Sequence, residues 1–537
     1  MADRARWTRC VAPRIMLCFA VVVLLLPLLA ACGVVPQSVA QIVTRDGGTL
    51  RLSGSSPSTL DPAVAQDVSS WEYLLQIYSG LVRLDKQLKV VPDIAQSWTV
   101  SPDGRTYTFA LRSDARFQNG QPITASDIKY SLDRALDPAT HSPVAAVYLG
   151  DIVGARARMR GAARDVSGIA VVNSHTLRIT IDKPESDFLS KLTYPTAFVV
   201  NRQNVESGPH WFQHPIGSGP FELKTWVPHD QLVLVRNPNY YGKTPTLGEI
   251  DYYLGPDPPI SLYRQGKLDV ATVGIGDVAR VSDPQGPYHN QLVTTPLFSL
   301  WYLGFNVHQK PFDDPKVRLA FAYATDKRKL INGLFQGSRT AANGILPPGM
   351  LGYDQAFAGI PYDPARARTL LAESSYKSAA NLPPIVLTVG ESVGQMAEGF
   401  AQMYHQNLGV NISVVQMQNG FFTALQQHQL QMFFLGWQAD YPDPQDFLGV
   451  LFEGTSQAND TGYNNAEVNQ ILSQARTETD PQKRTALYRR AQAIVVQDAP
   501  VIPLYFDTEY DLVKPSVTGL TITPIGIVSF AGVRVQG

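Results

Sequence analysis

The chain has 537 residues, of which 44% are hydrophobic and 17% are charged, and 45 Lys and Arg nearly balance 46 Asp and Glu for a formal net charge of -1. This composition is typical of a globular protein large enough for two or three domains. Because the charge is balanced and no basic cluster occurs, the sequence offers no electrostatic footprint for nucleic acid or for an acidic membrane surface. We therefore expect no nucleic-acid partner.

The N-terminus has the features of a secretory signal peptide. Arg4, Arg6, Arg9 and Arg14 precede an apolar run over residues 15–31, which is interrupted by a proline and ends in small residues. The run is short for a membrane span, so cleavage is favoured over anchoring.

The expected cut site, Leu29-Ala30-Ala31-Cys32, resembles a bacterial lipobox, in which the cysteine is lipidated and becomes the first residue. All three cysteines lie at or before Cys32, so the mature chain has no other thiol for disulfide, zinc or nucleophile chemistry. Residues 1–31 are therefore expected to be a lipoprotein signal peptide and residues 32–45 a lipidated stalk. The protein should be held at the extracytoplasmic face of the cell membrane. A plain secreted protein is the alternative.

Strand and helix patterns alternate along the rest of the chain without a repeat. Helix starts are indicated by Asp314-Pro315 and Asp480-Pro481, where an acid can cap the first turn and proline fits its first position. A further helix is predicted over residues 71–81, and a strand followed by a helix over residues 385–389 and 396–408. Alternation predicts the following strands: residues 49–54, 107–111, 176–181 and 231–236. The mixture indicates an α/β or α+β fold with more than one lobe.

Ordered blocks over nearly the whole mature chain carry a resemblance to a known family. They include STLDPA at 58–63, PDIAQSWTVSPDGRTYTFALRSDARFQNGQPITASDI at 92–128, GSGPFELKTWVPHDQLVLVRNPNYYG at 217–242, LYRQGKLDVA at 262–271, PFDDPKVRLAFAYATDKRKLI at 311–331, LPPGMLGY at 346–353, GWQADYPDPQDFL at 436–448 and APVIPLYF at 499–506. The chain resembles the extracellular solute-binding proteins, family 5, of ABC transporters, the oligopeptide and dipeptide receptor group.

The resemblance implies an α/β, two-lobed periplasmic-binding-protein-like fold (type II, cluster C) with an extra domain on the first lobe. The implied segments are 46–79, 172–272 and 506–537 for lobe one, 80–171 for the extra domain and 273–505 for lobe two. The implied function is capture of short peptides by lobe closure and delivery to an ABC permease, by a protein that is not an enzyme and acts as a monomer. Segment 151–177 resembles the oligopeptide branch of the family.

The stretch FFLGWQADYPDPQDF, residues 433–447, sets three carboxylates behind an apolar run expected to end a core strand at residues 433–435. The family places an aspartate for the ligand α-ammonium in its GW-x-x-D motif, which implies Asp440 here. Trp437 would emerge beside it at the cleft edge, and Gly436 would allow close approach of a backbone. Asp443 and Asp446 are expected to be solvated or to cap a helix.

The resemblance gives weaker support for a role in ligand binding at the other positions. Gln66, Asp67, Val68 and Ser69 fall where peptide receptors pair their backbone with the ligand, and Tyr505 lies near a cleft-lining aromatic. Two departures matter: Phe434 stands where some members have an arginine for the ligand carboxylate, and Val144 where some have a cleft tyrosine. Recognition of the ligand C-terminus is thus unassigned.

Alternatives of other classes remain. The ligand could be an oligosaccharide, an opine, glutathione or a nickel chelate, as in other family members. GESVG, residues 390–394, matches the nucleophile-elbow pattern of serine hydrolases, but the acid and histidines that follow Ser392 lie too near it in sequence to form a triad easily. Ser392 is more consistent with a helix cap. The scattered histidines show no metal-ligand spacing, so no metal or cofactor is expected.

Overall fold

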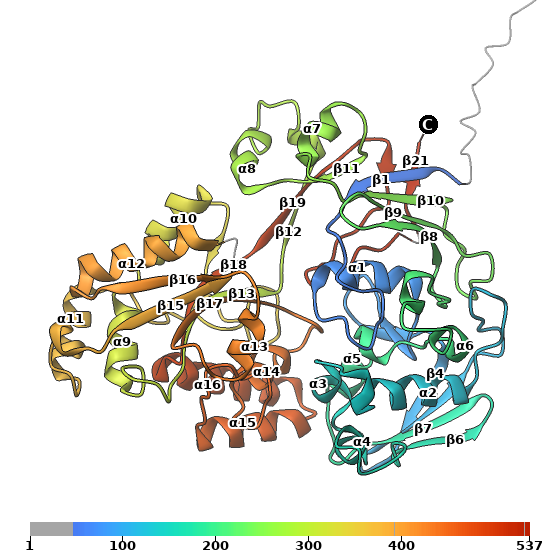
Figure 1. The fold of residues 1–537 in the computed structure, drawn as a ribbon, viewed down its shortest axis with the longest axis horizontal. Helices are drawn as coiled ribbons and strands as arrows, with labels where there is room; N and C mark the ends of the chain where they lie inside the picture. The colour runs from blue at the N-terminus through green and yellow to red at the C-terminus, as the bar shows by residue number, and fades with distance from the viewer. Residues whose placement is uncertain (1–46, 391–392, 531, 537) are drawn as a thin grey trace, which may run out of the picture. The chain divides into compact units, whose positions relative to one another are not determined.

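The computed structural model describes residues 47–536, except residues 391, 392 and 531. The predicted signal peptide, the predicted stalk with Cys32, and Glu391 and Ser392 of the GESVG motif all lie outside the described residues. Two large sheets dominate the described chain (Figure 1). They have seven and six strands, and each is the centre of one lobe.

The seven-stranded sheet of the first lobe is mixed, with β1 parallel to β10 and to β11 and the other pairs antiparallel. Its strands, in spatial order, are β12 (Leu292–Pro296), β19 (Thr508–Val513), β11 (Val270–Thr272), β1 (Thr49–Ser53), β10 (Glu249–Tyr253), β9 (Gln231–Arg236) and β8 (Phe221–Val227).

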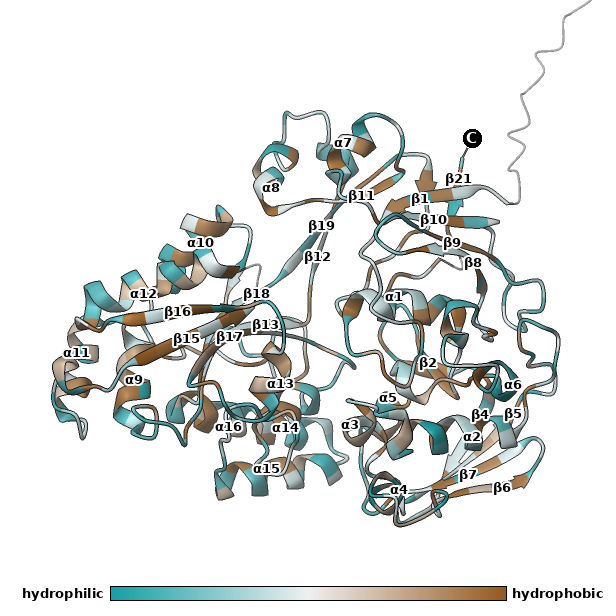
Figure 2. Ribbon diagram, in the orientation of Figure 1, coloured by the Kyte–Doolittle hydropathy of each residue, from teal (hydrophilic) through white to brown (hydrophobic). Residues whose placement is uncertain are grey.

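The six-stranded sheet of the second lobe is covered on both faces. Its strands, in spatial order, are β14 (Thr340–Ala341), β18 (Val501–Phe506), β13 (Ser299–Phe305), β17 (Met432–Gln438), β15 (Ile385–Gly390) and β16 (Ile412–Met417). Along β17, Met432 and Phe434 join one buried cluster while Phe433 joins another, because successive side chains of a strand point to opposite faces. Strands that are buried on both faces have nearly continuous runs of apolar residues. β15 and β17 fit this pattern, since both are largely brown, the colour of hydrophobic residues, in Figure 2.

The first lobe also carries a four-stranded antiparallel sheet: β4 (Ala95–Val100), β5 (Thr106–Leu111), β7 (Thr176–Thr180) and β6 (Ile169–Asn173). Two short pairs join β2 (Val82–Leu84) to β3 (Val90–Pro92) and β20 (Val517–Thr518) to β21 (Arg534–Val535).

The described helices follow in chain order. They are α1 (Val68–Ile77), α2 (Ala125–Ala135), α3 (Ala145–Leu149), α4 (Ala155–Met159), α5 (Phe188–Lys191), α6 (Arg202–Val205), α7 (Pro259–Arg264), α8 (Ile275–Val281), α9 (Pro315–Tyr323), α10 (Lys327–Phe335), α11 (Pro364–Glu373), α12 (Gly394–Leu408), α13 (Phe421–Gln426), α14 (Gln445–Phe452), α15 (Ala466–Thr477) and α16 (Pro481–Asp498). Short 3-10 turns occupy Pro138–Thr140, Pro195–Ala197, Trp211–Gln213, His289–Gln291 and Ala379–Asn381.

Two chain segments cross between the large sheets side by side. One runs from β12 into β13 and the other from β18 into β19. The Leu297 N–H donates to the Asp507 carbonyl at 3.0 Å, and the Asp507 N–H donates to Ser299 Oγ at 2.8 Å. Two short crossings held together in this way are suited to act as a hinge.

The predicted strands near the N-terminus and in the first lobe are confirmed as β1, β5, β7 and β9, and the two Asp-Pro helix starts as α9 and α16. Asp314 accepts from the Lys316 N–H at 2.8 Å and Asp480 from the Gln482 N–H at 2.8 Å. The prediction of a helix over residues 71–81 was wrong at both ends, because Asp67 caps an earlier start and Tyr78 is extended.

The strand expected to end at residue 435 continues to Gln438, because its pairing with β13 extends to Ser299. The domain boundaries stay a prediction. β12, in the range assigned to the second lobe, pairs with β19 in the seven-stranded sheet, and β7, in the range assigned to lobe one, belongs to the four-stranded sheet.

Candidate functional site

The turn that follows β17 holds Asp440 in a fixed position. The Ala439 N–H donates to the carbonyl of Phe298, in the crossing segment before β13, at 2.7 Å. The Asp440 N–H donates to Asp446 Oδ2 at 3.1 Å. Both bonds use main-chain atoms, so the Asp440 side chain is left free to meet another group.

Asp446 supports this turn from the first turn of α14. Its Oδ2 also accepts from Trp437 Nε1 at 3.1 Å, and its side chain is fully buried. The expectation that Asp446 is solvated was wrong, because the start of α14 turns the carboxylate inward toward an indole and a main-chain N–H. Its Oδ1 has no hydrogen-bond partner among the described residues.

Asp443 anchors the same turn to α16. It accepts from the Gln445 N–H at 2.9 Å, but Pro444 is the N-cap of α14, so Asp443 lies one position before the cap. It is not solvated either, because the Arg484 guanidinium binds both of its oxygens, at 2.7 and 2.8 Å. This two-bond pair fixes geometry as well as charge.

The first lobe reaches Asp440 through Tyr148, which lies on α3. The Tyr148 hydroxyl donates to the Asp440 carboxylate, and its ring stacks on Tyr194 with centroids 3.9 Å apart. The Tyr194 ring lies 6.0 Å from that of Trp71 on α1. Sequence reasoning missed Tyr148 and considered Val144, one helical turn earlier; Val144 itself is half-buried at the start of α3.

The half-buried carboxylate of Asp440 and the fully buried carboxylate of Asp446 form a pair without a cation among the described residues. Neither makes an ion pair with a Lys, Arg or His of the described residues. Burial raises the pKa of Asp440 to about 7, although the Tyr148 hydrogen bond opposes the shift. Burial and the charge of Asp440 raise the pKa of Asp446 well above its usual value. Such a pair binds a proton when empty and is suited to receive a positively charged group.

The predicted backbone-pairing segment lies at the start of α1. Gln66 and Val68 are exposed, while Asp67 caps the helix by accepting from the Ser70 N–H at 2.8 Å. Burial tends to raise the pKa of Asp67, but hydrogen bonds from Ser58, Ser69 and Ser70 outweigh this and lower it. No hydrogen bond or ion pair in the described chain joins this segment to Asp440.

Gly436 and Tyr505 belong to an aromatic stack behind the turn. A Cβ on Gly436 would lie 2.7 Å from the Trp301 indole, so only glycine fits opposite this ring. Trp301 stacks on Tyr505 at 5.9 Å and on Phe434 at 5.2 Å. Tyr505 and Phe434 are both buried. The stack forms a rigid support for the turn from residue 436 onward.

Each lobe inserts one aromatic side chain into the core of the other. Trp71 of α1 packs in the second-lobe cluster with Phe298 and Leu300, while Tyr441 packs in the cluster of the four-stranded sheet. The Tyr441 hydroxyl donates to Asp187 Oδ2 at 3.3 Å. Tyr441 directly follows Asp440, so the turn itself forms part of the contact between the lobes.

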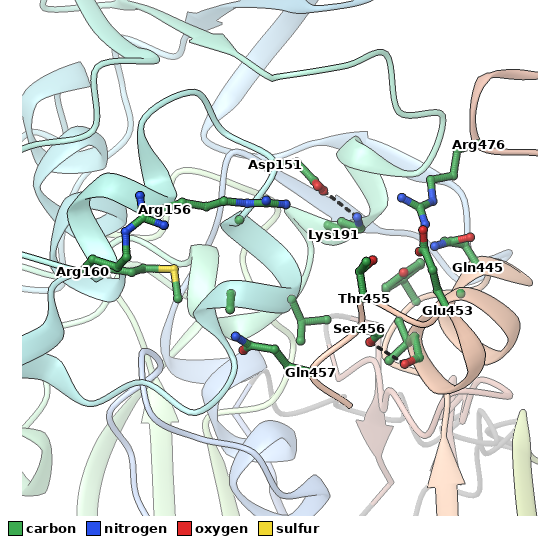
Figure 3. Close-up of a pocket in the computed structure, with 17 residues that line it drawn as sticks. Asp151, Arg156, Arg160, Lys191, Gln445, Glu453, Thr455, Ser456, Gln457 and Arg476 are labelled. Carbon is green, nitrogen blue, oxygen red and sulfur yellow. Dashed lines mark hydrogen bonds and ion pairs between the residues drawn. The ribbon is translucent and has the colours of Figure 1, made fainter. Parts of the chain in front are cut away.

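Beyond Tyr441 the lobes border a charged cavity of about 450 Å³ (Figure 3). On the first-lobe side Lys191 pairs with Asp151 at 2.6 Å, and on the second-lobe side Arg476 pairs with Glu453. Arg476 also lies 3.7 Å from Glu185, and the Ser186 N–H donates to the Arg476 carbonyl at 3.0 Å. These bonds join the lobes at a distance from the hinge.

Within the described ranges, no helix combines the length and the apolar character that crossing a membrane requires. The same part of the chain has no group of three His, Cys, Asp or Glu placed to hold a metal ion.

Comparison with solved structures defines the class of protein. The chain superposes on the murein tripeptide binding protein MppA of Escherichia coli with a TM-score of 0.82 at 28% identity, over 92% of this chain and 100% of that one. The predicted two-lobed, periplasmic-binding-protein-like α/β fold is confirmed.

Sequence relatives narrow the class to a family. The dipeptide-binding protein DppE of Bacillus subtilis is 30% identical over 88% of this chain and 89% of its own length. The glutathione-binding protein GsiB of Salmonella typhimurium is 31% identical over 88% of this chain and 91% of its own. Residues 89–459 match the family described as bacterial extracellular solute-binding proteins, family 5 Middle. The chain belongs to the bacterial extracellular solute-binding proteins, family 5.

Proposed function

We propose that this protein captures short peptides between its lobes and delivers them to the membrane permease of an ABC importer. The observation that carries the proposal is the half-buried Asp440 carboxylate at the contact between the lobes, which no cation of the described residues neutralises. A peptide α-ammonium is a group of the right charge, and burying it without an opposite charge would be prohibitive. The peptide-binding names of relatives such as DppE are consistent with this ligand class.

In the proposed mechanism the ligand drives lobe closure by touching both lobes. Trp437 and Asp440 belong to the second lobe, while Tyr148 and the start of α1, with Gln66 to Ser69, belong to the first. A ligand that binds the closed arrangement more tightly than the open one shifts the population toward it. The closed form is then the one that docks on the permease. The relatives are binding proteins, and we propose no enzymatic activity.

A non-peptide solute is the second candidate, and the glutathione-binding name of GsiB favours one form of it. Glutathione also carries a free α-ammonium, so Asp440 would serve it in the same way. The mass of the bound ligand distinguishes a mixture of short peptides from glutathione or another single solute.

Native mass spectrometry of the protein lacking residues 1–32, purified from a bacterium, tests the ligand class. We expect a spread of short-peptide masses released on unfolding. A single mass of glutathione or of another non-peptide solute would contradict the peptide proposal while leaving the receptor role in place.

We propose further that Cys32 is lipidated and anchors the protein outside the cytoplasm. Cys32→Ala should move the full-length protein from the membrane fraction to the soluble extracytoplasmic fraction, because acyl chains supply the anchoring. Cys18→Ala is the matched control, since Cys18 lies within the signal peptide, and it should leave the protein in the membrane fraction. Retention of the Cys32→Ala variant in membranes would contradict the lipid anchor.

Peptide affinity should fall in acid. Burial raises the pKa of Asp440 to about 7, so its carboxyl is ionised above that pH and protonated below it. A ligand ammonium favours the ionised form, so binding at pH 6 must release a proton. We expect affinity to fall by about tenfold for each pH unit below about 7, until the ligand-bound form also takes up the proton. Calorimetry at pH 6 in two buffers of different ionisation enthalpy measures the release, and its absence would contradict this linkage.

A further inference from the structure

The crossing strand β19 has an acidic face. Asp507, Glu509 and Asp511 occupy alternate positions, the first directly before the strand and the other two within it, and alternate side chains of a strand share one face. Asp507 pairs with Arg339 at 2.5 Å. Glu509 and Asp511 make no ion pair with a Lys or Arg of the described residues. Two of the three charges on this face therefore lack compensation from the protein.

Glu72 of α1 adds a third uncompensated acid to this face. It makes no ion pair in the described chain; the charge of Glu509 acts on it, and its own charge acts on Asp511. Burial and the charge of Glu509 raise the pKa of Glu72 to about 7. Burial and the neighbouring acids raise the pKa of Glu509 to about 7, and burial together with Glu72 does the same for Asp511. The three groups hold their protons more tightly because no cation is beside them.

Two buried polar atoms at this place have no partner. Asp511 is 2% exposed, and while its Oδ1 accepts from Thr272 Oγ1 at 3.1 Å, its Oδ2 accepts no hydrogen bond. The Tyr252 hydroxyl lies beside Glu72 in a side chain that is fully buried, and it also lacks a hydrogen bond of normal geometry. Native proteins rarely leave such groups unsatisfied, so these atoms point to a missing ligand group. No described acids here are placed to share a metal ion.

The acidic face lies on elements that are connected to the turn of Asp440 and to the crossing segments. Glu72 directly follows Trp71, the last ring in the series that leads from Asp440 through Tyr148 and Tyr194. The successive ring centroids are 3.9 and 6.0 Å apart. β19 follows one of the two crossing segments, and α1 starts at the predicted backbone-pairing segment, Gln66 to Ser69.

We propose that Glu72, Glu509 and Asp511 form a subsite for the cationic side chain of a lysine or arginine in the bound peptide. This inference rests on the proposed peptide-binding function and adds a preference for basic peptides. A side-chain ammonium or guanidinium would give Asp511 Oδ2 the donor it lacks and would neutralise the acids that face it. The acidic groups would then ionise and bind the cation through charge-assisted hydrogen bonds.

Calorimetry with matched tripeptides tests the subsite. Ala-Lys-Ala and Ala-Ala-Lys are each compared with the peptide in which norleucine, which has a similar length but no charge, replaces lysine. We expect at least one lysine peptide to bind about tenfold or more tightly than its norleucine counterpart. Equal affinities at both positions would overturn the subsite. If no peptide binds at all, the proposed function fails instead.

Amide variants locate the effect. Glu72→Gln and Glu509→Gln keep the side-chain shape, and each is expected to reduce the lysine preference by about tenfold while the norleucine peptides bind as before. Glu222→Gln is the matched control, because Glu222 is also half-buried with a raised pKa but lies on β8 at the other edge of the sheet. A lysine preference that survives both amide variants, with circular dichroism showing intact folds, would overturn the assignment.

Discussion

Replacing Asp440 with asparagine is expected to weaken the binding of unmodified peptides by about two to three orders of magnitude. The substitution removes one partner of a buried charge pair, which costs about 3 to 5 kcal/mol, and each 1.4 kcal/mol is about tenfold in affinity. The fold should persist, because the bonds that hold the turn use main-chain atoms of Ala439 and Asp440. Calorimetry with a tripeptide measures the loss.

Asp460→Asn is the matched control for this variant. Asp460 is also a half-buried carboxyl of the second lobe whose pKa burial raises to about 7. It lies away from the turn of Asp440, beside His428, a residue that precedes β17. Its replacement should leave peptide affinity unchanged within about threefold. If Asp440→Asn binds as tightly as Asp460→Asn does, Asp440 is not the amine anchor.

Arg484→Met is expected to lower the free energy of unfolding by about 3 to 5 kcal/mol. Arg484 is 11% exposed and is the cation that neutralises Asp443, so the substitution leaves that carboxylate buried and unpaired. The turn that carries Asp440 also loses its attachment to α16. Urea denaturation measures the change, and adding Asp443→Asn to the variant should recover part of it, because the unpaired charge is then removed.

Arg490→Met provides the comparison on the same helix. Arg490 pairs with Glu467, but the two side chains are 63% and 54% exposed, and surface pairs contribute about 0 to 1 kcal/mol. We expect this variant to be nearly as stable as the unmodified protein. Equal destabilisation by the two substitutions would show that helix α16 tolerates neither change and that the buried pair has no special importance.

Local patterns predicted much of the fold. Alternation located β1, β5, β7 and β9, and the Asp-Pro pairs located the starts of α9 and α16, because capping and proline geometry depend on adjacent residues. The end of β17 was not predictable in this way, since it depends on pairing with β13, which is distant in sequence.

The candidate site was predicted only in part for the same reason. The GWQAD motif identified Asp440, but the partners of its carboxylate come from elsewhere in the chain: Tyr148 lies 292 positions away. Asp446 was expected to be solvated or to cap a helix, because the neighbouring prolines suggest a turn and acids favour helix starts. Its burial follows from contacts with Trp437 and the Asp440 main chain that only the folded turn creates.

The measurement that tests the central claim most directly is calorimetry of the protein lacking residues 1–32 with tri-alanine and with N-acetyl-tri-alanine. The two ligands differ at the amine alone. Since acetylation removes the charge that Asp440 is proposed to bind, we expect tri-alanine to bind about a hundredfold or more tightly. Equal affinities would contradict the account, because the site would then hold its ligand without recognising the α-ammonium.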